Sequence, residues 1–90
     1  MSKTAAELHD EVVDLLDALQ GTRRRLSEIK HEFARLDPDE LDVDEIGDTT
    51  TAGVTVQAAS AGLGDVDRAV ALAQDAVYAA MRHTSRLRNV

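Results

Sequence analysis

Residues 12–36 read VVDLLDALQGTRRRLSEIKHEFARL, and apolar side chains recur in this stretch at alternating steps of three and four residues. Such steps align side chains in one stripe along an α-helix, and a period near 3.5 residues is typical of helices that wrap around a partner helix. The sequence therefore predicts a long helix with one apolar face. The members of this first stripe, extended by one step toward the N-terminus, are Leu8, Val12, Leu15, Leu19, Thr22, Leu26, Ile29, Phe33 and Leu36.

The second half of the chain repeats this period with smaller side chains. Small residues allow close approach of another helix, and the large residues of the first stripe would pack well against them. We therefore predict an all-α antiparallel helical hairpin. Its apolar faces are wider than one seam, so we expect a four-helix bundle formed by dimerisation. The second stripe consists of Val56, Ala59, Leu63, Val66, Val70, Ala73, Val77, Ala80, Thr84 and Leu87.

Capping and helix-breaking residues predict the boundaries of a single domain over residues 1–90. Thr4 and Glu7 have the spacing of a capping box, and Asp37 precedes a proline that disfavours helical geometry, so the first helix should span about residues 4–36. An acidic connector follows over residues 37–48. The threonines at 49–51 offer an N-cap for a second helix that should span about residues 50–87.

Two glycines leave the continuity of the second helix open. Gly62 and Gly64 could break it, with Asp65 capping a second piece. Leu63 and Val66 nevertheless keep the heptad phase of the whole stripe, which favours one continuous helix.

The distribution of charge also fits an antiparallel hairpin. Residues 7–17 are strongly acidic, whereas the charged side chains of residues 82–88 are all arginines. Folding the chain at the connector therefore brings opposite charges together. The same fold brings residues 23–25, three arginines, near Asp65 and Asp67. Ordinary complementarity between charges and helix dipoles explains the acidic start and the basic end equally well.

Composition limits the class of function. The net charge of −7 over 90 residues opposes phosphate binding, so nucleic acid is an unlikely partner even with arginines at 23–25. The chain lacks cysteine, an apolar leader and an apolar run of membrane-spanning length, so we expect a cytoplasmic protein that does not enter a membrane. One alternative function is that of a small nucleic-acid accessory protein that uses the arginine cluster at residues 23–25.

The sequence offers weak candidates for metal binding and no catalytic constellation. Glu28 and His31 have the E-x-x-H spacing of ferritin-like helical hairpins, which is the alternative metal-binding function. Both should point away from the stripe, and residues 50–87 contain no glutamate to complete a site. Residues 42–47 resemble the start of an EF-hand loop, but Ile46 and Gly53 occupy ligand positions. We therefore expect no enzyme, no cofactor and no specific metal site.

In size and layout the chain resembles the helical hairpins of the WXG100 (ESAT-6-like) group. This resemblance implies a dimeric helical bundle and export by type VII secretion without a cleavable signal, which is the alternative to the cytoplasm. The Trp-x-Gly turn of that group is absent, because Glu45-Ile46 precede the turn glycine and the chain has no tryptophan. Tyr78 is followed four residues later by Arg82, where the export signal of the group has an acid.

These observations predict a non-enzymatic protein–protein interaction module. It should assemble with a second copy or with a similar hairpin through its apolar stripes. The expected interface residues are Leu8, Val12, Leu15, Leu19, Leu26, Ile29, Phe33, Leu36, Val56, Leu63, Val66, Val70, Val77 and Leu87.

Overall fold

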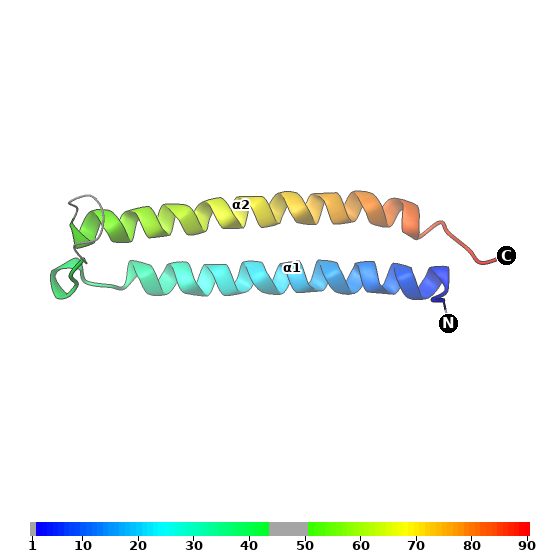
Figure 1. The fold of residues 1–90 in the computed structure, drawn as a ribbon, viewed down its shortest axis with the longest axis horizontal. Coiled ribbons are helices and arrows are strands. Elements are labelled where there is room, and N and C mark those ends of the chain that lie inside the picture. Colours follow the sequence, from blue (N-terminus) through cyan, green and yellow to red (C-terminus); the bar gives the residue numbers. More distant parts are fainter. Residues whose placement is uncertain (1, 44–50) are drawn as a thin grey trace.

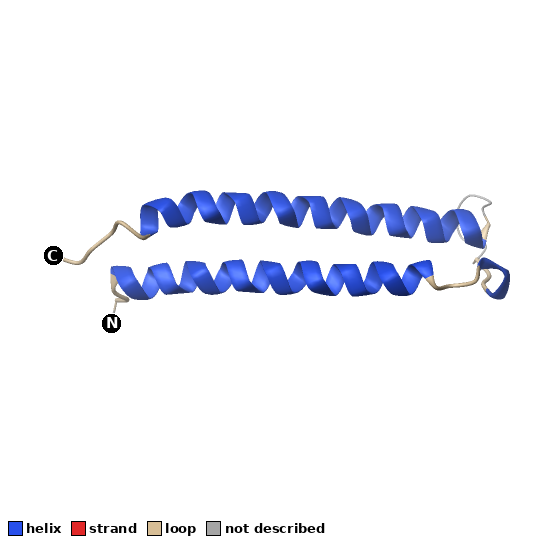
Figure 2. Ribbon diagram, turned by 180° about the vertical axis from the view of Figure 1, so that it is seen from behind, coloured by secondary structure: helices blue, strands red, loops and turns tan. Residues whose placement is uncertain are grey.

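A computed structural model describes residues 2–43 and 51–90 of the chain. Its two long elements, α1 (Ala5–Ala34) and α2 (Ala52–Thr84), run antiparallel side by side, and both termini lie at the same end (Figure 1). The part of the chain that the structure describes contains no strand (Figure 2). The predicted all-α helical hairpin is therefore confirmed.

The first turn of each helix is capped by a threonine, as the sequence predicts. Thr4 Oγ1 accepts a hydrogen bond from the backbone N–H of Glu7 at 3.1 Å. Thr51 Oγ1 accepts one from the backbone N–H of Val54 at 3.2 Å. Each bond satisfies a backbone donor that the first helical turn leaves without an intrahelical partner.

Both helices end slightly earlier than expected, at Ala34 and Thr84. After α1 the backbone N–H of Leu36 bonds to the carbonyl of Phe33, three residues back, and this tighter turn leads into a 3-10 turn over Pro38–Glu40. A similar tightening follows α2. The rest of the predicted connector, residues 44–48, lies outside the described residues, as do Thr49 and Thr50 and most of the EF-hand-like segment.

α2 is continuous through Gly62 and Gly64, as the heptad phase predicted. A Cβ atom at Gly62 would have no other group within 4 Å, so this glycine marks no close approach of another element. Helical geometry persists there because the residues on both sides keep the same contact with α1.

The line of contact between the helices differs from the predicted stripe in one respect. Leu15 belongs to the predicted stripe but is 51% exposed, whereas its neighbour Leu16 is 6% exposed. The residues that face α2 are Val12, Leu16, Leu19 and Arg23, again at alternating steps of four and three. The predicted period is therefore right, but Leu16 rather than Leu15 faces α2. Two helices alone share only one narrow seam, so not every apolar side chain of the stripe can lie in it.

Residues seven positions apart form columns along each helix, and three adjacent columns of each helix line or border the contact between the helices. The central columns are half-buried or buried throughout and comprise Ala5, Val12, Leu19, Leu26 and Phe33 of α1 and Val56, Leu63, Val70, Val77 and Thr84 of α2. The inner columns, four residues later, comprise His9, Leu16, Arg23 and Lys30 of α1 and Ser60, Asp67, Gln74 and Met81 of α2. The outer columns, three residues later, comprise Leu8, Leu15, Thr22, Ile29 and Leu36 of α1 and Ala59, Val66, Ala73, Ala80 and Leu87 of α2.

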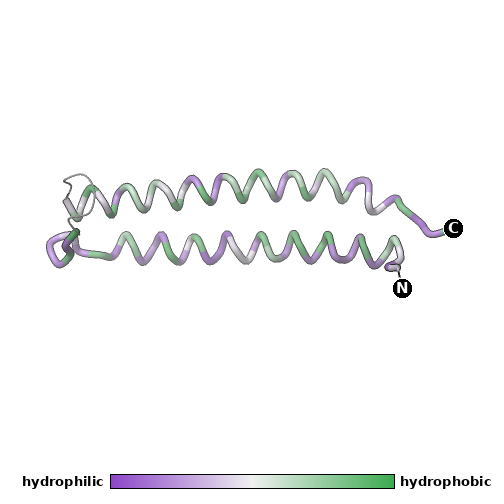
Figure 3. The backbone as a smooth tube through the Cα atoms, in the orientation of Figure 1, coloured by the Kyte–Doolittle hydropathy of each residue, from purple (hydrophilic) through white to green (hydrophobic). Residues whose placement is uncertain are grey.

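The hairpin is a rod with very little interior. It measures 64 × 25 × 24 Å, and hydrophobic residues alternate with hydrophilic ones along both helices (Figure 3). Within the described residues only Leu16 and Leu26 are buried hydrophobic residues, and no side chain is less than 2% exposed. Such a small core provides little hydrophobic stabilisation against the entropy of ordering the chain.

Candidate interaction surface

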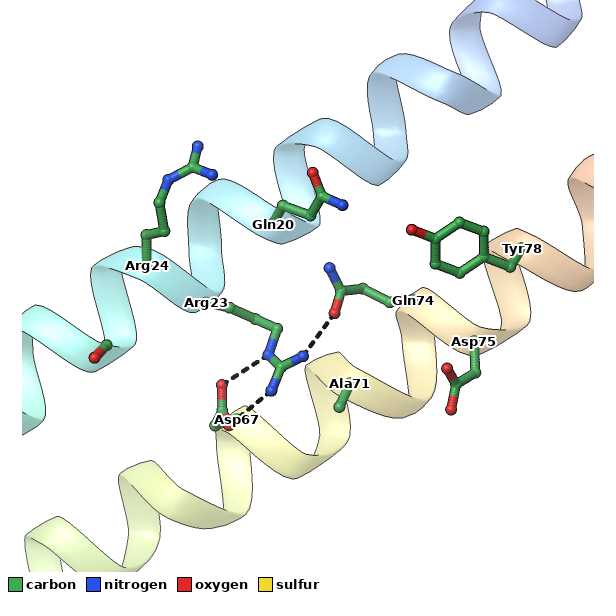
Figure 4. Close-up of a pocket in the computed structure, with 9 residues that line it drawn as sticks. Gln20, Arg23, Arg24, Asp67, Ala71, Gln74, Asp75 and Tyr78 are labelled. Atoms are coloured by element: carbon green, nitrogen blue, oxygen red, sulfur yellow. Dashed lines mark hydrogen bonds and ion pairs between the residues drawn. The ribbon is translucent and has the colours of Figure 1, made fainter.

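The centre of the seam is polar and is organised around Arg23 (Figure 4). Its Nε donates to Asp67 Oδ1 at 3.0 Å, and its Nη2 donates to Asp67 Oδ2 at 3.3 Å. Its Nη1 donates to Oε1 of Gln74 at 2.9 Å, and Gln74 is 8% exposed. Arg23 thus joins α1 to two residues of α2 that lie about two helical turns apart, and a bidentate guanidinium–carboxylate pair fixes the relative orientation of the two helices.

This arrangement shifts the ionisation of both charged partners. The hydrogen bond from Arg23 holds the pKa of the Asp67 carboxyl below its ordinary value, and the charges of Arg23, Lys30 and Arg68 act in the same direction against partial desolvation. The hydrogen bond to Asp67 correspondingly raises the pKa of Arg23. Both side chains are partly exposed, at 42% for Arg23 and 32% for Asp67, so water screens much of their attraction.

An open groove lies beside this polar bridge on one face of the hairpin (Figure 4). Four of its lining residues directly follow central-column residues. The Arg23 guanidinium, which lines this groove, is already bonded to Asp67 and Gln74 within the chain. The four residues are Gln20 and Ser27 of α1 and Ala71 and Tyr78 of α2.

The outer columns lie on the opposite face. An antiparallel helix pair has an approximate two-fold axis perpendicular to the plane of the helices, so equivalent columns of the two helices emerge on the same face. The groove illustrates this, because the residues that both helices contribute to it are equivalent in the heptad. In both helices the outer column flanks the central column on the side away from the groove. The two outer columns therefore form one surface, which we call the outer face.

Large apolar side chains of the outer face are exposed. Leu8 is 50% exposed, Leu36 is 42% exposed and Leu87 is 64% exposed, and Val66 is also exposed. At the C-terminal end of α1, a shallow groove of about 540 Å³ includes Leu36 and its apolar neighbours. That groove is lined by Arg25, Glu28, Ile29, Glu32, Phe33 and Leu36. Exposed apolar side chains gathered on one face are the usual mark of a protein interaction site.

The expected interface residues therefore separate into two groups. One group lies in the central columns and packs within the hairpin: Val12, Leu19, Leu26, Phe33, Val56, Leu63, Val70 and Val77. The other group lies in the outer columns: Leu8, Leu15, Ile29, Leu36, Val66 and Leu87. Sequence reasoning missed the role of Gln74, although a polar residue one heptad earlier, Asp67, stands in the same column and was a detectable signal.

The weak candidates for metal and phosphate chemistry are spread over the seam, the edge of the outer face and the outside of α1. Glu28 and His31 are exposed and border a shallow hollow on the outside of α1. Over residues 2–43 and 51–90, no three His, Cys, Asp or Glu side chains gather in a group that could hold a metal ion. Arg25 pairs with Glu28 of its own helix at 3.4 Å, so of the three predicted arginine contacts to α2 only that of Arg23 to Asp67 is present.

At the end that carries both termini, two hydrogen bonds join the two halves of the chain. His9 Nδ1 and Thr84 Oγ1 lie 2.7 Å apart, and the backbone N–H of Ala5 donates to Asn89 Oδ1 at 2.6 Å. The predicted pairing of the acidic start with the terminal arginines is not seen among the described side chains, where Glu11 pairs with Lys3 instead. His9 therefore joins the helices at this end by a hydrogen bond rather than by a charge pair.

No protein-family model matches the chain, and neither a curated protein nor a solved structure matches it. The two-helix layout agrees with the WXG100 resemblance, which remains one of architecture. Neither α1 nor α2 has a stretch apolar enough to cross a membrane.

Proposed function

We propose that this chain is a non-enzymatic protein–protein interaction module, and that the outer face is the surface through which it assembles into a four-helix bundle. The observation that carries the proposal is the placement of its leucines. Among residues 2–43 and 51–90 only two hydrophobic side chains are buried, while Leu8, Leu15 and Leu87 of the outer face are each at least half exposed. A second hairpin on this face would remove these side chains from water.

The energetics of a small domain support the same conclusion. Full burial of a leucine side chain contributes about 1.5–3 kcal/mol relative to exposure, so each half-exposed leucine leaves about half of that contribution unused. The interior formed by Leu16 and Leu26 is small for a chain of 90 residues. Both partners bury apolar side chains when they associate. A four-helix bundle therefore gains hydrophobic stabilisation that a single hairpin lacks.

The outer face also has the form that helix packing requires. Its α2 side consists mainly of alanines, and neighbouring positions add Gly62, Ala69 and Ala76. A flat surface of small residues admits a helix at close range, and the α1 side supplies the large residues that such a surface accommodates.

The test is the solution mass of the protein by light scattering across a concentration series, with two matched variants. Leu15→Glu places a charge on the outer face, and Tyr78→Glu places the same charge at an equally exposed position on the opposite face. We expect twice the 9.7 kDa chain mass for the wild type and for Tyr78→Glu, and the single mass for Leu15→Glu. A stable wild-type monomer at all concentrations, or equal effects of both variants, would contradict the proposal.

A further inference from the structure

The two halves of the outer face differ in the size of their side chains. The outer column of α1 carries three leucines and an isoleucine, whereas that of α2 carries three alanines, with Val66 and Leu87. A partner that fits this surface must therefore present small residues to α1 and large residues to α2. The outer face itself does so when it is rotated by half a turn about the long axis of the rod.

We infer that the partner is a second copy of this chain, related by a two-fold axis parallel to the rod, so that α1 of each copy lies antiparallel on α2 of the other. This inference rests on the proposed function and specifies its partner and geometry. We call it the crossed dimer. In the alternative dimer the two-fold axis runs across the rod, so α1 lies on α1 and α2 on α2.

Packing within each helix pair favours the crossed dimer. The outer column of α1 then faces mainly smaller side chains of α2, and the helix separation is the same on both sides of the bundle because the two-fold axis makes the two contacts equivalent. In the alternative dimer, leucines would face leucines on one side and alanines would face alanines on the other. Because interaxial distance depends on the side chains at the contact, those two sides would demand different separations, and one of them would be poorly filled.

The heights of the residues along the rod give the crossed dimer a definite register. In the hairpin, Arg23 lies opposite Asp67 and Gln74, and His9 lies opposite Thr84. A rotation about the long axis preserves these heights, so α1 of one copy meets α2 of the other at the same levels. Two outer-column pairs are then leucine with alanine, Leu15 with Ala80 and Leu36 with Ala59, while Thr22 meets Ala73, Ile29 meets Val66 and Leu8 meets Leu87.

Charges at the rim of the outer face point the same way. The columns that border the outer column of α1 carry five acids and two arginines, whereas those of α2 carry only Asp65, His83 and Arg86. Placing α1 on α1 would set two acidic rims against each other. Placing α1 on α2 sets the acidic rim against a rim of no net charge and brings Glu7 level with Arg86.

One like-charged pair does arise in the crossed dimer. Glu28 of one copy comes level with Asp65 of the other. Each of these acids is already paired within its own helix, Glu28 with Arg25 at 3.4 Å and Asp65 with Arg68. The repulsion between them is therefore offset by two arginines at the same level, and exposed charges of this kind contribute little.

Disulfide trapping tests the crossed dimer cleanly because the wild-type chain contains no cysteine. Three single variants are needed: Thr22→Cys on α1, Ala73→Cys on α2, and the control Ala71→Cys, which lies near the height of Ala73 on the opposite face. We expect equimolar Thr22→Cys and Ala73→Cys, mixed and oxidised, to form a cross-linked heterodimer on the order of a hundredfold faster than Thr22→Cys with Ala71→Cys, because facing thiols have a high effective concentration.

The outcomes separate this inference from the proposed function. Rapid cross-linking of the Thr22→Cys and Ala73→Cys mixture, with little product from either variant alone, supports the crossed dimer. A dimeric mass by light scattering with cross-linking no faster than in the control mixture, or with rapid cross-linking of Thr22→Cys to itself, overturns the crossed dimer and leaves association intact. A monomeric mass for the wild type overturns both.

Discussion

The seam and the outer face of this hairpin distribute polarity in opposite ways. The seam holds Arg23, Asp67 and the buried Gln74 at its centre. The outer face leaves Leu8 and Leu15 half exposed. A chain that folded for its own stability alone would place the leucines inside and the charged groups outside. The seam therefore sets the register of the two helices, while much of the apolar surface stays exposed, and this exposed part is the surface that we propose for a contact beyond the hairpin.

The polar centre also explains how two helices with such small apolar interiors keep a unique alignment. The valine side chains that recur on the α2 side of the seam permit sliding, because neighbouring registers bury similar areas. The bonds from Arg23 to two residues of α2 form at only one register. Buried polar groups are known to select register in helical assemblies at some cost in stability.

The largest expected effect distinguishes two adjacent leucines. Leu16→Ala removes a buried side chain of the seam and should lower the free energy of unfolding by about 2–5 kcal/mol. Leu15→Ala removes an exposed side chain and should lower it by less than about 1 kcal/mol at concentrations where the protein is monomeric. Urea unfolding followed by circular dichroism measures both. Equal losses would show that the seam and the outer face are not distinct.

A smaller effect is expected at the polar centre. Gln74→Ala removes the acceptor of the Arg23 Nη1 hydrogen bond together with a buried side chain, and should lower the free energy of unfolding by about 1–2 kcal/mol. The matched control Asp75→Ala changes the next residue, which is exposed, and should shift stability by no more than about 0.5 kcal/mol. If both variants unfold at the same urea concentration, the polar centre has no part in stabilising the seam.

The smallest expected effect concerns pH. The pKa of Asp67 is lowered in the folded hairpin by Arg23, so the pair stabilises the fold above the ordinary carboxyl pKa of about 3.9, and this contribution is lost as pH falls through the lowered value. Asp67→Asn should therefore destabilise the protein at neutral pH and flatten its stability profile in acid. The same substitution in an Arg23→Gln background should flatten the profile much less, because only the charges of Lys30 and Arg68 still act on Asp67, and an identical flattening there would assign the effect to charges other than Arg23.

Much of the fold was predictable because it follows from short-range pattern. Alternating steps of three and four residues define helices, and threonine before a helical run defines its start, so Thr4 and Thr51 could be anticipated as caps or cap candidates. The phase of Leu63 and Val66 likewise predicted continuity through the glycines. These signals depend on neighbours within one turn, and they do not require knowledge of the partner element.

The division of the surface was not predictable in the same way. Leu15 and Leu16 are adjacent, identical in type and both compatible with an apolar stripe, so the period alone does not decide which one faces α2. That choice depends on the partner helix, through the contacts of Arg23 with Asp67 and Gln74. Charge pairing across helices was predicted too broadly, because a long side chain finds an acid on its own helix as easily as on the next, as Arg25 does with Glu28.

The rod shape has a consequence for how the protein moves through a sizing column. Its radius of gyration is 19.9 Å, whereas a globular chain of this length would have about 12 Å, and the same relation gives 19.9 Å only for a globular chain of about 330 residues. A single copy should therefore elute far ahead of compact standards of its mass. Two rods bundled side by side keep the same length while doubling the mass, so elution volume responds only weakly to association.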